Sequence, residues 1–533
     1  MSFKSPFPDV EIPSSTVYDF LFGRMEEVDF LRSALIDGGT GATISFRSLI
    51  DQIDSVAGAL ATRGLAVGDV AAVHMPNVPE FASIIHGILR AGGTATPVHA
   101  LYTAEEIANQ LVDSKARFLF TMSALLPQAA IAAEAAGIVA GRLIVVDGSE
   151  GYPSLGDLLA DRSPVPQIVI DPATHIALLP YSSGTTGKPK GVMLTHRNLV
   201  ANLCQLEPLM DVGPGHHIIA VLPFFHIYGF NTLLNAGLHR RATIITMSKF
   251  DLKDFLTLVA TWRCTYLYVA PPIVVALAKH PMIESFDLSS IRTILCAAAA
   301  LDEQLGRAVA ARLGCRVRQA YGMTEMSPAS HGIPENRDDI PHGSIGLTMA
   351  NIECKLIDLT TGDEIDPPAE GLSQPGELCC KGPNVMAGYL GRDDATVEVI
   401  DQDGFLHTGD VARVNSEGVV FIVDRLKELI KYKGYQVPPA ELEAVLLSHP
   451  AIADAAVIGV RNADGEEHPK AFVVQQPDTR LEDAEVMDFV AERVAPHKRV
   501  RAVEFIDSVP RSVAGKILRK NLKELEASRA ATT

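Results

Sequence analysis

The distribution of apolar residues changes once along the chain, near residue 352, and this change limits the possible folds more than any other feature. Before it, helix-like and strand-like stretches alternate: residues 49–60 carry apolar side chains at helical spacing, residues 70–75 form a short apolar run, and residues 81–89 return to helical spacing. Such alternation predicts an α/β sheet with helices covering its faces.

After residue 352 the chain has short apolar runs separated by turn residues, which predicts a β-rich subdomain over about 352–423. The charged tract 424–428 then marks a boundary. The remaining residues, 424–533, carry their own helix and strand signals, with a helix beginning at Pro439. They are expected to form a separate α+β domain, because a segment of this length can fold alone. The predicted fold class is therefore α/β plus α+β.

The charge balance excludes several classes of partner. The 533 residues include 64 acidic side chains against 46 lysines and arginines, a formal net charge of −18. Such a chain is a poor non-specific binder of nucleic acid or anionic membranes, so an anionic ligand must be held by a local group of cations. No apolar run in the sequence reaches the roughly 18 residues of a membrane-spanning helix. We expect no nucleic-acid partner and no membrane span.

The cysteines and the ends of the sequence bear on the compartment. The seven cysteines lack the paired short spacings of structural zinc sites, which indicates a reducing compartment without disulfides. The first residues interrupt their apolar stretches with proline and acidic side chains, unlike a signal peptide. The last three residues are not a peroxisomal tripeptide. We therefore expect a cytoplasmic protein.

The strongest local signal follows the apolar run 176–180. The segment Tyr181–Gly191, YSSGTTGKPKG, can bend its backbone N–H groups around an anion, donate hydrogen bonds from its hydroxyls and neutralise charge with its lysines. It is not a Walker A loop, because Lys188 is followed by Pro189. A flexible linker would not place two lysines so close behind a buried strand. The sequence therefore predicts a phosphate-binding loop.

This loop is one of five ordered motifs that together resemble the adenylate-forming superfamily of acyl-CoA synthetases, firefly-type luciferases and nonribosomal adenylation domains. The other four are QAYGMTE (319–325), GFLHTGD (404–410), DRLK (424–427) and PRSVAGK (510–516). Within the superfamily, the 4-coumarate:CoA ligase branch is most similar in the segments FHIYG (225–229), APPI (270–273), DLSS (287–290) and KYKGYQV (431–437).

The resemblance implies an AMP-forming carboxylic acid:CoA ligase. A carboxylate attacks the α-phosphate of ATP to give acyl-AMP and pyrophosphate, and the thiol of coenzyme A then displaces AMP. The acid is already ionised at neutral pH, so the first step needs no general base. It needs Mg²⁺, lysine and hydroxyl donors to stabilise charge at phosphorus. The implied ligands are ATP, Mg²⁺, coenzyme A and a small-molecule carboxylic acid, either aromatic (cinnamate-like) or medium-chain. The oligomeric state stays open between monomer and homodimer.

The resemblance also assigns the nucleotide site. Tyr321 would lie on the adenine, Thr324 would contact the α-phosphate and Glu325 would hold Mg²⁺. Without the family, Thr324 and Glu325 would also fit a helix N-cap with a first-turn acid. Asp410 and Arg425 would bind the ribose hydroxyls, which suits a carboxylate acceptor and a forked donor. The β- and γ-phosphates would be held by Ser182, Ser183, Gly184, Thr185, Thr186, Gly187, Lys188 and Lys190. Residue 188 is usually apolar in the family, so the division of work between the two lysines stays open.

Two further residues would act at the acid. Lys516 would reach the substrate carboxylate and the α-phosphate during adenylation; without the family it would be a surface lysine in a basic tail. His226 would gate the carboxylate site instead of acting as a strong base, and without the family it would be a packed core histidine.

The resemblance implies a moving C-terminal domain. Lys427 would be the hinge between an N-terminal adenylation domain, 1–426, and a mobile domain, 427–533. Rotation would exchange the face that carries Lys516 for a second face. That face would hold the catalytic residues Lys431 and Gln436 and the coenzyme A contacts Lys433, Gly434 and Tyr435. Without the family, this stretch would be the basic end of a helix stopped by glycine.

The acyl pocket departs from the plant-type pattern. Leu295 stands where a lysine is common, and Ala297 and Ala320 each stand where the family has glycine, so the pocket should be narrower and more apolar. By resemblance its lining is Tyr228, Asn231, Tyr268, Leu295, Ala297, Ala298, Ala320, Gly322, Pro328 and Ala329. Two alternatives stay open: an acyl-AMP ligase that delivers to a carrier protein, and a catalytically silent nucleotide-binding module.

Overall fold

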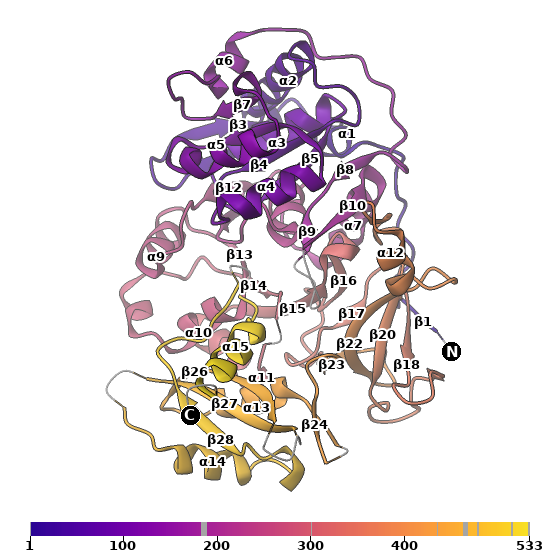
Figure 1. The fold of residues 1–533 in the computed structure, drawn as a ribbon, viewed down its shortest axis with the longest axis vertical. Coiled ribbons are helices and arrows are strands. Elements are labelled where there is room, and N and C mark those ends of the chain that lie inside the picture. The colour runs from indigo at the N-terminus through magenta and orange to yellow at the C-terminus, as the bar shows by residue number, and fades with distance from the viewer. Residues whose placement is uncertain are drawn as a thin grey trace.

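The computed structural model describes residues 2–182, 189–299, 301–433, 435–461, 467–476, 479–512 and 515–530. These residues form a large N-terminal α/β domain that includes a β-rich part, and a smaller C-terminal α+β domain (Figure 1). The predicted fold class is confirmed. Among the described residues no helix is long and apolar enough to cross a membrane.

Two sheets with parallel centres form the core of the N-terminal domain. Their central strands are buried along almost their whole length because helices cover both faces, as in other parallel sheets. The first sheet has the order β21 (Gly388–Tyr389), β10 (Lys190–Thr195), β8 (Ile176–Leu178), β5 (Thr94–Val98), β4 (Val70–His74), β6 (Ala116–Thr121), β7 (Leu143–Val145), with β9 (Tyr181–Ser182) paired to β10. The second has the order β17 (Leu347–Thr348), β16 (Ala329–Gly332), β15 (Arg316–Gly322), β14 (Thr293–Cys296), β13 (Tyr266–Val269), β11 (His217–Ala220), β12 (Thr243–Thr246), β2 (Ser33–Asp37), β3 (Thr43–Ser45).

The helices of this domain begin mostly at side-chain caps. Thr103, for example, accepts a hydrogen bond from the N–H of Glu106, whose carboxylate bonds back to the N–H of Thr103. The described helices are α1 (Val17–Phe22), α2 (Phe46–Thr62), α3 (Glu80–Arg90), α4 (Ala104–Asp113), α5 (Leu126–Ala135), α6 (Leu155–Ala160), α7 (His196–Leu206), α8 (Ala236–His239), α9 (Leu252–Thr261), α10 (Pro271–Lys279), α11 (Glu303–Leu313) and α12 (Asp393–Val399). A π-helical segment, η5 (Tyr228–Asn235), precedes α8.

The β-rich part lies after residue 352, where the turn residues predicted short strands. Its sheet has the order β1 (Phe3–Lys4), β18 (Glu353–Ile357), β20 (Gly376–Lys381), β22 (Leu406–Val414), β23 (Val420–Arg425), with β19 (Glu364–Ile365) paired to β18. Two strands pair with a distant part of the chain. β1, from the N-terminus, pairs with β18 of this sheet, and β21, from this region, pairs with β10 of the first α/β sheet. The β-rich part is therefore tied to the α/β core at two places.

The C-terminal domain packs three helices on a sheet, the orange to yellow part of Figure 1. Its elements are β24 (Ile430–Tyr432), β25 (Tyr435–Val437), α13 (Pro439–Leu447), β26 (Ile452–Arg461), β27 (Glu467–Gln475), α14 (Asp483–Ala491), β28 (Ala502–Phe505) and α15 (Arg519–Ala530). The alternative of a helix end at Lys431 and Lys433 is wrong, because Lys431 and Gln436 are paired across the antiparallel strands β24 and β25. Ile430 and Val437 are buried at the base of this hairpin, and this packing outweighs the local preference of the lysines for a helix.

Candidate active site

A cavity opens where the C-terminal ends of β14 and β15 meet the start of η5. It encloses about 490 Å³ of space not filled by protein atoms, including the space at its open mouth. The carboxyl ends of parallel strands are where open α/β sheets bind ligands. Its lining is Leu206, His226, Ile227, Tyr228, Thr232, Ala297, Ala298, Ala320, Tyr321, Gly322, Met323, Thr324, Pro328, Ala329 and Lys516.

Most of the predicted acyl-pocket residues line this cavity, and three stand behind the lining. Asn231 is fully buried and donates to the carbonyls of Leu199 and Ser327, at 3.2 and 2.8 Å. Tyr268 packs edge-on against Tyr228, with ring centroids 6.4 Å apart. The carbonyl of Leu295 accepts a hydrogen bond from the Tyr228 hydroxyl at 3.1 Å. These three residues hold the wall in place from behind.

The floor of the cavity depends on a close approach of two backbone segments. A Cβ atom at Gly322 would lie 2.1 Å from the carbonyl oxygen of Pro328, so a larger residue does not fit there. Ala320, two residues earlier on β15, contributes its methyl group to the lining. The cavity wall here is therefore apolar and fixed by backbone.

His226 lines the cavity in a neutral form. Burial, together with the charge of Lys516, lowers the pKa of the His226 ring to about 3. Its Nδ1 accepts the N–H of Tyr228 at 3.2 Å, which leaves Nε2 as the protonated ring nitrogen. The ring can donate a hydrogen bond from Nε2, and it is a weak base at neutral pH.

Tyr321, which lines the cavity, lies together with two other predicted nucleotide residues, Asp410 and Arg425. The Tyr321 hydroxyl donates to Asp410 Oδ2 at 2.6 Å, and Arg425 Nε lies 3.3 Å from Asp410 Oδ1. Asp410 and Arg425 are direct partners across β22 and β23. Burial raises the pKa of the Asp410 carboxyl, and Arg425 and Tyr321 oppose that rise. The strand pairing therefore places one acceptor and one forked donor next to an aromatic ring.

Glu325 links Ser182, at the start of the predicted phosphate-binding loop, to Tyr389 of β21. Its Oε1 accepts the hydroxyls of Ser182 at 3.0 Å and of Tyr389 at 2.9 Å, and Oε2 has no donor among the described residues. Lys190 lies over the Tyr389 ring, 4.8 Å from its centroid.

Thr324 begins a short 3-10 turn, Thr324–Met326, and does not act as its N-cap. The N-cap reading of Thr324 is therefore wrong.

Lys516 enters the cavity from the C-terminal domain. Burial, then repulsion from Arg425, lowers the pKa of its ammonium group, while Asp410 and Glu325 raise it. The residue before it, Gly515, has φ +82°, and a Cβ there would lie 3.0 Å from Ala270 and 3.3 Å from Pro272. Glycine therefore permits the loop to pack on the first turn of α10.

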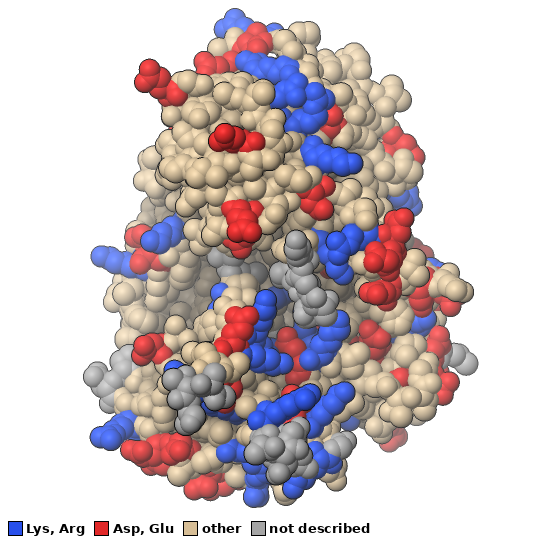
Figure 2. Space-filling view, viewed as in Figure 1, with Lys and Arg blue, Asp and Glu red and all other residues tan. Residues whose placement is uncertain are grey.

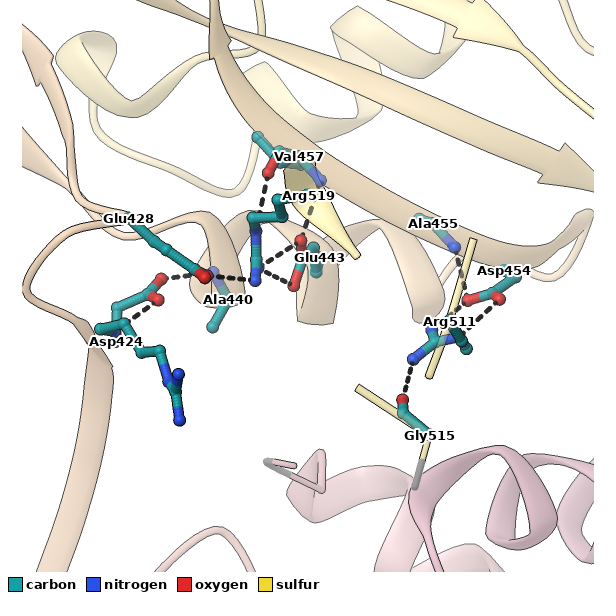
Figure 3. Close-up of polar contacts among 11 residues, drawn as sticks. Asp424, Glu428, Ala440, Glu443, Asp454, Ala455, Val457, Arg511, Gly515 and Arg519 are labelled. Carbon is teal, nitrogen blue, oxygen red and sulfur yellow. Dashed lines mark hydrogen bonds and ion pairs between the residues drawn. The ribbon is translucent and has the colours of Figure 1, made fainter. Parts of the chain in front are cut away.

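Arg519, at the start of α15, connects the linker after β23 to the C-terminal domain (Figure 3). It binds both carboxylate oxygens of Glu443, at 2.7 and 2.8 Å, and also contacts Glu428. Asp424 accepts the N–H groups of Arg425 and Ala440 at 2.7 and 2.8 Å. These bonds fix the domain relative to β23.

The predicted second face and the hinge lie away from the cavity. Lys427 is exposed in the turn between β23 and β24. Lys431, Lys433, Tyr435 and Gln436 belong to the β24–β25 hairpin and are not among the lining residues. Tyr435 stacks on His497, with ring centroids 4.5 Å apart. Ser183, Gly184, Thr185, Thr186, Gly187, Lys188 and Gly434 lie outside the described residues.

Sequence reasoning missed some of the residues that meet here. No motif includes Leu206 of α7 or Thr232 of η5, and Tyr389 comes from the crossing strand β21. Figure 2, in the same view as Figure 1, shows a recess across the front of the molecule with lysine and arginine side chains gathered along its lower side. A chain with a net charge of −18 thus concentrates cations locally.

Comparison with known proteins agrees with this geometry. The family model for AMP-binding enzymes matches residues 29–390, and that for the AMP-binding enzyme C-terminal domain matches residues 441–516. The 4-coumarate–CoA ligase 5 of Oryza sativa subsp. japonica is 38% identical over 98% of this chain and 96% of its own length. The 4-coumarate–CoA ligase 2 of Nicotiana tabacum is 37% identical, with the same coverage.

Two solved structures have the same fold over almost the whole chain. ATP-bound MatB from Rhodopseudomonas palustris superposes with a TM-score of 0.86 at 29% identity, covering 96% of this chain and 99% of that one. The anthranilate CoA ligase AuaEII, in complex with anthranoyl-AMP, gives 0.88 at 25% identity, covering 97% and 99%. The chain therefore belongs to the AMP-binding enzyme family and is an AMP-forming acid–CoA ligase. The predicted family and enzyme class are confirmed.

Proposed function

We propose that this ligase activates an apolar carboxylic acid, either an unhydroxylated aryl acid or a medium-chain acid. The observation that carries the proposal is the meeting of Lys516 with a cavity wall of alanine, leucine and methionine side chains. ATP and coenzyme A are the co-substrates expected for the family. The reaction would proceed through acyl-AMP with release of pyrophosphate, followed by displacement of AMP by the thiol.

In the first step the chain would supply cations and hydrogen-bond donors. The substrate carboxylate is ionised at neutral pH and attacks phosphorus without a base. Lys516 lines the cavity and would stabilise the charge that develops between the carboxylate and the α-phosphate. His226, neutral and protonated on Nε2, would donate a hydrogen bond to the acid and close the mouth of the pocket.

The nucleotide would lie against Tyr321, with Asp410 and Arg425 on the ribose hydroxyls. Glu325 fits a magnesium ligand, because it is a buried carboxylate whose Oε2 has no donor among the described residues. Bound Mg²⁺ would neutralise charge on the phosphate oxygens. Ser182 and Tyr389 would orient the Glu325 carboxylate, and Lys190, over the Tyr389 ring, would reach the phosphates.

The second step would require a rotation of the C-terminal domain. Lys516 and the β24–β25 hairpin belong to the same domain, but only Lys516 lines the cavity. A single arrangement of the domains therefore cannot place Lys431 and Gln436 at the cavity while Lys516 lines it. Rotation about Lys427, between the domains 1–426 and 427–533, would exchange the two faces. The coenzyme A contacts would then be Lys433, Gly434 and Tyr435.

The test is an assay of AMP and pyrophosphate release over aromatic acids and linear acids from C4 to C14, with and without coenzyme A. We expect unhydroxylated aryl or medium-chain acids to be the best substrates and the thioester to form only with coenzyme A. A preference for caffeate or ferulate would contradict the acid class. Thioester formation on a carrier protein in place of coenzyme A would favour the carrier alternative.

A further inference from the structure

Three side chains of different ligand type meet on β20 and β22, outside the cavity. Cys379 and His407 are direct partners across the two strands, and Glu377 lies two residues before Cys379. Nδ1 of His407 lies 2.9 Å from Glu377 Oε2 and 3.5 Å from Cys379 Sγ. The three potential ligand atoms all lie within 4.8 Å of one another. The strand pairing, and not a spacing in the sequence, creates this group.

The surroundings orient the Glu377 carboxylate and place a second carboxylate near the outer ring nitrogen of His407. Glu377 Oε1 accepts the N–H of Gly409 at 3.1 Å, which leaves Oε2 turned toward the imidazole. Asp401 Oδ2 lies 3.7 Å from His407 Nε2, and Lys355 Nζ lies 2.8 Å from the same Asp401 oxygen. A carboxylate behind the second ring nitrogen is the usual outer partner of a metal-binding histidine.

We propose that Glu377, Cys379 and His407 form a binding site for a divalent cation of the Zn²⁺ class. The ligands would be one carboxylate oxygen, the Cys379 thiolate and His407 Nδ1, with water completing a tetrahedron. Binding would release the thiol proton to solvent and place the imidazole proton on Nε2, facing Asp401. Mg²⁺ would not compete, because it prefers oxygen ligands in octahedral geometry.

Exposure is compatible with entry of an ion. The Cys379 side chain is buried, while those of Glu377 and His407 are 16% and 31% exposed, so the site opens to solvent on the carboxylate and imidazole side. Cys380 offers a matched control. It is the next residue on β20, it is also fully buried, and its Sγ lies 3.6 Å from Cys354 Sγ, on the other side of the strand.

The experiment is a titration of the full-length protein with Co²⁺, which reports a thiolate ligand by a charge-transfer absorption band. We expect the band to saturate at one equivalent in the wild type and in Cys380→Ser, and to be absent in Cys379→Ser. Zn²⁺ should abolish the band by displacement and should raise the melting temperature of the wild type, whereas excess Mg²⁺ should do neither.

Two results would overturn the proposal: no band in the wild type, or a band that persists in Cys379→Ser and disappears in Cys380→Ser. The melting temperature of each variant without metal checks that it is folded. If Cys379→Ser does not fold, His407→Asn and Glu377→Gln decide the question. Each should weaken Co²⁺ binding at least tenfold, and unchanged affinity in both would exclude these ligands.

Discussion

Arg511 binds both carboxylate oxygens of Asp454, at 2.7 and 3.2 Å, and donates a further hydrogen bond to the carbonyl of Gly515 at 2.8 Å. Gly515 immediately precedes Lys516, and Asp454 lies on β26 (Figure 3). The ion pair therefore fixes the segment that carries Lys516 to the sheet of the C-terminal domain. A two-bond arginine–carboxylate contact restrains position as well as charge.

The first prediction follows from this restraint. Asp454→Asn should lower kcat/KM for acyl-AMP formation by roughly tenfold, or about 1.4 kcal/mol, because Lys516 would be held less firmly. Conversion of preformed acyl-AMP to thioester should be unchanged. Glu492→Gln, which breaks an exposed ion pair with Arg493, serves as the control and should affect neither step. Equal losses in the two half-reactions of Asp454→Asn would contradict the positioning role.

Removal of the lysine itself should act more strongly. Lys516→Ala should slow acyl-AMP formation roughly 150-fold or more, which corresponds to about 3 kcal/mol of lost transition-state stabilisation. The reason is that the ammonium group stabilises negative charge that develops only in the transition state. Thioester formation from preformed acyl-AMP should remain. Lys520→Ala, at an exposed lysine of α15, is the matched control. The two half-reactions are measured separately by pyrophosphate release and by thioester formation.

The hinge role of Lys427 can be tested through the backbone. The N–H of Glu428 bonds to the carbonyl of Arg425, so Lys427 occupies the third position of a turn in this arrangement. Proline is disfavoured there because it forces the preceding residue, Leu426, out of the helical region. Lys427→Pro should therefore lower adenylation at least tenfold and change the ratio of the two half-reactions.

Lys427→Ala is the control for this experiment, because it removes the charge and leaves the backbone free. It should keep the wild-type ratio of adenylation to thioester formation. If Lys427→Pro and Lys427→Ala gave the same ratio, the hinge would lie elsewhere in the linker.

The pKa of His226 leads to a prediction about pH. With a folded value of about 3 against 6.5 in the unfolded chain, the ring is neutral from pH 5 to 8. His226→Asn should therefore lower the rate of adenylation without changing the shape of its pH profile. Below pH 6.5 the unfolded chain binds the extra proton, so the wild type should lose stability on acidification relative to His226→Asn. An inflection near pH 6.5 in the adenylation rate of the wild type that disappears in His226→Asn would contradict the neutral ring.

The sequence predicted the elements better than the connections between them. Helical spacing over 49–60 and the apolar run 70–75 correspond to α2 and β4, because local periodicity and burial agree there. The strand β1 and the crossing strand β21 were not predicted, because each is short and is stabilised only by a partner far away in the chain. The β24–β25 hairpin was mistaken for a helix end for a related reason: its stability comes from the burial of Ile430 and Val437.

The candidate site, too, could be predicted from the sequence only in part. Family motifs marked Tyr321, Asp410 and Lys516, which the fold brings to one place from three separate regions of the chain. No motif marked Leu206 or Thr232, because an acyl pocket is filled by whatever side chains the packing of α7 and η5 presents. The identity of such residues follows from tertiary structure alone.

The acyl pocket yields the last prediction. Ala320 lines the cavity two residues before Gly322. At Gly322 the backbone of Pro328 lies so close that β15 cannot shift toward it. One methylene-sized change in an apolar pocket is worth about 1–3 kcal/mol, or roughly 10- to 200-fold in specificity. Ala320→Gly should therefore raise kcat/KM for ring-substituted cinnamates such as ferulate more than for a linear C8 acid, because only the ring needs width at that depth. The ratio of the two kcat/KM values is the measurement, and the linear acid controls for any general effect of the glycine. An equal change for both acids would mean that residue 320 does not limit the width of the pocket.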